Sequence, residues 1–125
     1  MLSKLEREVR KTLIKVCRGE IQTVHHRKIN YKALWEKHSP SGGNWNRSRT
    51  PEVVEWIVNI SNYDVEHGRP PLNSLVVRID TGQPGDEWHS WHKEAGRPYK
   101  SLAHAQEACW AYWPEKSILL RFQSK

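Results

Sequence analysis

The N-terminal segment alternates apolar and basic side chains with the period of a helix. Apolar side chains recur every three or four positions, as on one helix face, at Leu2, Leu5, Val9, Leu13 and Val16. Basic side chains fall within a similar arc on the opposite side, at Lys4, Arg7, Lys11, Lys15 and Arg18. Gly19 is placed to end the helix. Residues 2–18 are therefore predicted to form an amphipathic helix with a basic outer stripe.

A second helix is predicted over residues 51–67, and it is apolar on most of its sides. Thr50 is a suitable N-cap, Pro51 suits the first helical position, and Glu52 lies near the positive end of the helix dipole. Gly68 marks the end of the helix. Its polar stripe is narrow and consists of Glu52, Glu55, Asn59, Asn62 and Glu66. A helix this apolar is expected to lie at the centre of the core.

The remaining patterns complete a mixed architecture. Asn30 can cap a short helix over 31–37, Ser101 can cap another over 102–113, and a further helix is expected over 87–95. The apolar runs 74–79 and 117–122 predict strands that pair in a small sheet. We therefore expect residues 1–125 to form a single α+β domain. Four or five helices would surround the central helix 51–67, beside a two- or three-stranded antiparallel sheet.

Charge is distributed unevenly along the chain. Residues 1–49 hold 12 Lys and Arg against 4 Asp and Glu, a net charge of +8, whereas residues 50–125 hold 8 against 10, a net charge of −2. Such asymmetry favours a polyanionic partner. No apolar stretch approaches the length of a membrane span, and MLSKLEREVRKTL lacks the apolar region of a signal peptide. We therefore expect a cytoplasmic protein with no membrane partner.

The basic residues suggest an anion-binding surface in two parts. The first part is the helical stripe, continued by Arg27 and Lys28. The second is the loop before helix 51–67, where backbone N–H groups at a helix start favour phosphate. Its candidate residues are Trp45, Asn46, Arg47, Ser48 and Arg49, with Trp45 available to stack on a base. In the alternative interpretation, the loop is ordinary surface and Trp45 packs back on the core.

The order of the elements also fits a winged-helix DNA-binding domain. This fold requires two helices followed by a β-hairpin, and the chain offers them in that order as helix 29–37, helix 51–67 and a hairpin near 74–90. However, helix 51–67 would be the recognition helix, and it carries four acids and no Lys or Arg. Phosphates would repel its polar stripe, so any bound DNA is expected to contact residues 1–49 instead.

Metal chemistry has weaker support. His89 and His92 lie three residues apart and would share a helix face, as a metal pair can. Trp88 and Trp91 have the same spacing, however, which favours a helix with tryptophans inside and histidines outside. A metal-dependent nuclease would draw on acids that fall in no recognisable motif, namely Asp64, Glu66, Asp80, Asp86 and Glu87. We therefore expect no catalytic residue and no cofactor.

Cysteine and tryptophan residues are interpreted structurally. Cys17 and Cys109 have no metal-binding spacing, and in a cytoplasmic protein they are expected to be free thiols. The chain has seven tryptophans, most of which are expected to be buried in the core.

Residues 68–88, with 29–37 before them, resemble a family of uncharacterised small proteins from bacteria and their mobile elements. The resemblance is carried by Arg69-Pro70-Pro71-Leu72, Leu75-Val76-Val77 and Thr81-Gly82-Gln83-Pro84-Gly85. It implies a bacterial or phage origin and a role in conflict between the two, but it carries over no activity and no site residues.

These observations together favour a non-enzymatic binding protein. Its ligand is expected to be nucleic acid or a phosphorylated molecule, bound through residues 1–49. One alternative is a protein-interaction module, such as a phage or plasmid inhibitor that docks on an acidic host protein. A second alternative is a small metal-dependent nuclease.

Overall fold

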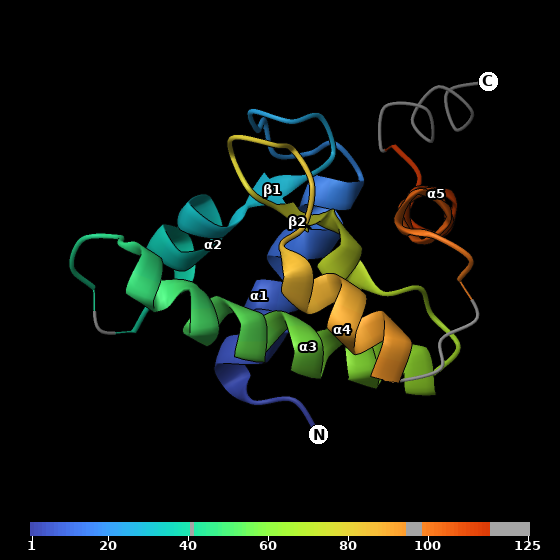
Figure 1. Cartoon of the computed structure of the whole chain (residues 1–125), viewed down its shortest axis with the longest axis horizontal. Coiled ribbons are helices and arrows are strands. Elements are labelled where there is room, and N and C mark those ends of the chain that lie inside the picture. The colour runs from blue at the N-terminus through green and yellow to red at the C-terminus, as the bar shows by residue number, and fades with distance from the viewer. Residues whose placement is uncertain (41, 95–98, 116–125) are drawn as a thin grey trace.

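The computed structural model describes residues 1–40, 42–94 and 99–115. Within these residues, five α-helices and a two-stranded sheet form a mostly helical α+β arrangement (Figure 1). The elements in chain order are α1 (Lys4–Cys17), β1 (Ile29–Asn30), α2 (Tyr31–His38), a 3₁₀ turn (Arg47–Arg49), α3 (Thr50–Glu66), a second 3₁₀ turn (Leu72–Leu75), β2 (Val76–Val77), α4 (Asp86–Glu94) and α5 (Leu102–Tyr112). None of these helices is long and apolar enough to cross a membrane.

Helix α1 confirms the predicted amphipathic helix. A capping box closes its N-terminus: the Ser3 hydroxyl accepts a hydrogen bond from the Glu6 backbone N–H at 3.1 Å, and the Glu6 carboxylate accepts one from the Ser3 N–H at 2.9 Å. Gly19, at φ +71°, follows the last turn. Val9, Leu13 and Val16 are completely buried, so the predicted apolar face is the packed face.

Helix α3 is the central helix, as its pattern predicts. It contacts α1, α2 and both 3₁₀ turns, and it buries Val53, Trp56, Ile57 and Ile60. The predicted cap is wrong, because Thr50 already has helical backbone angles. The chain enters α3 through the 3₁₀ turn, and the side chain that caps this turn is Asn46, which accepts from the Ser48 N–H at 2.9 Å.

The predicted antiparallel sheet is also wrong. β1 and β2 run parallel, with Ile29 opposite Val76 and Asn30 opposite Val77. Residues 72–77 are all buried, and the first four form a 3₁₀ turn, so only two residues remain extended. An apolar run that is buried on every side does not reveal its pairing partner from periodicity alone. The predicted strand 117–122 lies outside the described residues.

The hairpin expected of a winged helix does not form within residues 74–90. After β2 the chain reverses tightly, since the Arg78 N–H donates to the Gln83 carbonyl and the Gly82 N–H to the Arg78 carbonyl, both at 2.8 Å. The chain then enters α4 at Asp86 instead of a second strand. The expected reversal is therefore present, but the element that follows it is a helix.

The other helices agree with their patterns, and the tryptophans occupy the core. Asn30 caps α2, and Ser101 caps α5. The larger apolar cluster joins α1, α2 and α3, and a smaller one packs Trp88 and Trp91 of α4 against Ala105 of α5 and the side of α3. All seven tryptophans belong to or pack against these clusters, which confirms their structural interpretation.

Candidate anion-binding surface

The basic stripe of α1 points directly away from the core. Lys4, Arg7, Lys11 and Lys15 are all exposed. The first and last of them are eleven positions apart, which is about 16 Å along a helix axis at 1.5 Å per residue. This length equals roughly five nucleotide steps along one strand of a duplex, at about 3.4 Å per step.

These four cations are largely unengaged. The Lys4 and Lys15 side chains make no ion pair or hydrogen bond within the described part of the chain. The Arg7 side chain donates only to the Leu2 carbonyl, at 3.1 Å, among the described residues. Lys11 lies 3.5 Å from Glu8, but both side chains are more than half exposed, so the pair contributes little. Arg18 is different, since it is half-buried beside Glu20 at 3.7 Å.

The end of α2 lies beside this stripe. His38 Nε2 is 2.7 Å from the Thr12 hydroxyl of α1. Burial and the neighbouring Lys37 cation lower the pKa of His38, whereas the Glu8 carboxylate acts in the opposite sense. Lys37 is exposed. The positive surface of α1 is therefore continued by the last turn of α2.

The side chains of Arg27 and Lys28 donate hydrogen bonds to backbone carbonyls elsewhere in the protein. Arg27 donates to the Cys17 carbonyl at 2.6 Å and to the carbonyls of Trp110 and Trp113 at 3.2 and 3.1 Å, so it joins the C-terminal ends of α1 and α5. Its guanidinium also lies over the Trp110 ring. The Lys28 ammonium donates to the Gly82 carbonyl at 3.3 Å. These contacts leave little of the Arg27 cation for a ligand, whereas the Lys28 ammonium makes one such contact within the described part of the protein.

The loop before α3 is also occupied by contacts within the protein. Trp45 is half-buried, with its ring 5.9 Å from that of Trp35, so it packs back on the core. Arg49 lies over the same Trp35 ring at 5.4 Å and 3.9 Å from Glu52. Arg47 is exposed and has no partner among the described side chains.

The backbone N–H groups of this loop are used as well. Asn46 accepts from the Ser48 N–H and hydroxyl, the Arg49 N–H donates to the Asn46 carbonyl, and the Thr50 N–H donates to the Arg47 carbonyl. The N–H groups of Ser48, Arg49 and Thr50 are therefore already paired and do not face a phosphate.

Sequence reasoning missed a buried charge cluster between α1 and α3. Asp64 is 1% exposed, and its carboxylate accepts from Arg10 at 2.9 and 3.1 Å and from Arg69 at 2.7 Å. Hydrogen bonding to Asp64 raises the pKa of Arg69. The only available signal was an acid placed within an apolar helix, because charged residues are buried when they are paired. This pairing fixes Asp64 as an ion-pair partner of two arginines.

The metal candidates do not converge. His92 stacks on the Trp88 ring at 4.9 Å, while its neighbour His89 is exposed. Asp80 pairs with Arg78 at 3.1 Å, and Glu87 accepts a hydrogen bond from Tyr31. Across residues 1–40, 42–94 and 99–115, no three His, Cys, Asp or Glu side chains gather where they could hold a metal ion.

Both cysteines are buried free thiols, as predicted. Cys17 donates to the Cys109 carbonyl at 3.3 Å, and Cys109 donates to the Pro71 carbonyl at 3.2 Å. Burial raises the pKa of Cys17 to about 12 and also raises the pKa of Cys109. Neither thiol is therefore activated as a nucleophile.

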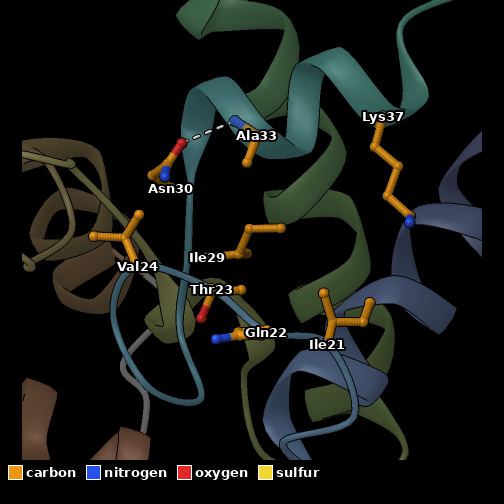
Figure 2. Close-up of a pocket in the computed structure, with 8 residues that line it drawn as sticks. All are labelled: Ile21, Gln22, Thr23, Val24, Ile29, Asn30, Ala33 and Lys37. Carbon is orange, nitrogen blue, oxygen red and sulfur yellow. Dashed lines mark hydrogen bonds between the residues drawn. The ribbon is translucent and has the colours of Figure 1, made fainter.

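An apolar hollow lies between α2 and the segment that follows α1 (Figure 2). Its volume is about 480 Å³, and its lining residues are Ile21, Gln22, Thr23, Val24, Ile29, Asn30, Ala33 and Lys37. Sequence reasoning did not anticipate this hollow, since residues 20–28 carry no regular pattern.

Comparisons with protein families, with curated proteins and with solved structures find no match to this chain.

Proposed function

We propose that this protein binds nucleic acid, or a ligand with several phosphate groups, through the exposed basic face of α1. The observation that carries the proposal is the row formed by Lys4, Arg7, Lys11 and Lys15, which faces solvent almost without acidic partners. Cations in a row gain affinity for a polyanion by releasing its condensed counterions. Lys37 extends the row onto α2.

The proposal concerns binding without sequence readout or chemistry. Lysines contact phosphates as point charges, and phosphate contacts position a protein on nucleic acid without reading its bases. Trp45, which could have stacked on a base, packs against Trp35 instead. Affinity is therefore expected to be similar for unrelated sequences of the same length.

A matched pair of double variants tests the proposal. K4Q/K15Q removes two charges from the row, and K93Q/K100Q removes two charges from exposed positions on α4 and just before α5. Binding to a fluorescently labelled duplex is measured by anisotropy at about 50 mM salt, where phosphate contacts are strong. We expect K4Q/K15Q to weaken binding roughly tenfold and K93Q/K100Q to weaken it less than about twofold, because only the first pair contacts phosphates.

Two results would contradict the proposal. The first is that the wild-type protein binds neither duplex nor single-stranded DNA or RNA at this salt concentration. The second is that the two double variants lose the same amount of duplex affinity, which would show that affinity follows total charge and not the α1 row.

A further inference from the structure

We infer that the apolar hollow beside α2 is a docking site for a short segment of a partner protein. This segment would combine aliphatic side chains with Asp or Glu. The hollow is formed mainly by Ile21, Val24, Ile29 and Ala33. At about 480 Å³, it falls within the usual range for binding pockets, roughly 300–1,000 Å³. It therefore has room for more than one aliphatic side chain.

Two exposed apolar side chains lie on neighbouring loops, one of which lines the hollow. The exposed fraction is 70% for Val24 and 58% for Ile79, which are among the few large apolar residues of the described chain that face solvent. Their two loops lie side by side at the top of Figure 1. His25 Nε2 lies 3.2 Å from the Ile79 carbonyl, so the two loops are linked.

Gly82 keeps the two loops in close contact. A Cβ atom at this position would lie 3.1 Å from the His25 ring, and the backbone has φ +68°. The Lys28 ammonium also bonds the Gly82 carbonyl. The two loops that carry Val24 and Ile79 are thus held against each other beside the hollow.

The positive charge of Lys37 at the edge of the hollow favours a docked segment that carries an acidic side chain. Figure 2 shows Lys37 at the opposite end of the hollow from Val24. Lys37 is exposed and makes no ion pair within the described residues. The nearby acids are engaged, since Glu20 lies beside Arg18 and Glu115 beside His26. Glu36 is adjacent in sequence but does not line the hollow. An acidic side chain of the occupant would therefore complete an ion pair with Lys37.

The lining distinguishes this site from the proposed nucleic-acid surface. It contains no aromatic side chain on which a base could stack. Its aliphatic side chains suit Leu, Ile or Val of a peptide, and the positive end suits Asp or Glu. The hollow shares only Lys37 with the proposed nucleic-acid surface, and none of Lys4, Arg7, Lys11 and Lys15 lines it. Substitutions within the α1 row therefore test nucleic-acid binding without altering the hollow.

Selection from a displayed library of random dodecapeptides tests the inference, followed by calorimetry with the synthetic peptides that are enriched. We expect enriched peptides to combine aliphatic residues with Asp or Glu. Peptide binding should weaken at least tenfold in each of two variants, Val24→Asp and Lys37→Glu. Each variant places a negative charge beside the hollow, where it repels an acidic peptide. The matched controls Tyr112→Ser and Lys100→Glu alter an exposed apolar residue and an exposed lysine elsewhere, and they should retain wild-type affinity.

Other outcomes overturn the inference. A selection that yields no peptide, or yields peptides without acidic residues, excludes the proposed occupant. If the peptides bind Val24→Asp and Lys37→Glu as tightly as they bind the wild-type protein, the peptide site lies outside the hollow. Concentration-dependent dimerisation that Val24→Asp abolishes would assign the hollow to a second copy of the chain. The inference itself predicts that K4Q/K15Q retains peptide binding while it loses duplex binding, and loss of both together would contradict a separate peptide site.

Discussion

Asp64 illustrates how a residue's neighbours decide its role. It lies within an apolar helix, and by residue type it is one of the acids that could serve metal-assisted hydrolysis. Its carboxylate instead holds Arg10, which is 54 positions away, and Arg69, which follows shortly after α3. The pattern of a single sequence does not reveal pairs this far apart, so the sequence indicates an acid inside an apolar helix but not its two arginine partners.

Replacement of Asp64 by Asn should destabilise the protein strongly. The substitution leaves two arginines without their shared counterion. Breaking a buried ion pair costs about 3–5 kcal/mol. We expect about 3 kcal/mol, because both arginine side chains are 21% exposed and water compensates in part. Urea unfolding gives the free energy of unfolding. Glu55→Gln, at an exposed position of the same helix, should change it by less than about 0.5 kcal/mol. A loss below about 1 kcal/mol for Asp64→Asn would show that the cluster is not important for stability.

The two thiols should be unreactive in the folded protein. Both are buried, and the raised pKa of each thiol keeps it protonated at pH 8. We expect a colorimetric disulfide reagent to modify both cysteines only as fast as the protein unfolds, and immediately in concentrated urea. Rapid modification of either cysteine without denaturant would contradict the burial of that side chain.

At the scale of elements, helices could be predicted and strand pairing could not. Each helix has local signals, such as Asn30 and Ser101 at N-caps and Gly19 at a helix end, and these signals act over a few residues. The sheet depends on contact between β1 and β2, which are far apart in sequence. β1 has only two residues, too few for a periodic pattern. The cap of α3 was misplaced because a 3₁₀ turn shifts the start of the helical chain to Asn46.

The capping box of α1 should contribute measurably to stability. Ser3→Ala removes the hydroxyl that accepts from the Glu6 N–H, and loss of such a cap costs about 1 kcal/mol. Thermal and urea unfolding measure the change. Ser90→Ala, at an exposed position inside α4, should be neutral or slightly stabilising because Ala favours helix interiors. Equal effects of the two substitutions would argue against a specific cap.

At the scale of the whole molecule, the sequence predicts the sign of the surface charge but not which cations are free. The net charge of +8 over residues 1–49 includes Arg10, Arg27 and Arg49, which the fold uses for internal contacts. The stripe of α1 could be foreseen, because helical periodicity places it opposite the core. The apolar hollow could not, because it forms where an irregular segment meets α2 and β1.

The dependence of duplex affinity on salt concentration tests the central claim most directly. If three or four cations of the α1 row contact phosphates, a plot of log K against log salt should have a slope of about −3 to −4, since each contact contributes about −0.9. K4Q/K15Q should make this slope shallower by nearly 2, while K93Q/K100Q should leave it unchanged. A slope near zero for the wild-type protein, or the same slope in K4Q/K15Q, would contradict binding through α1.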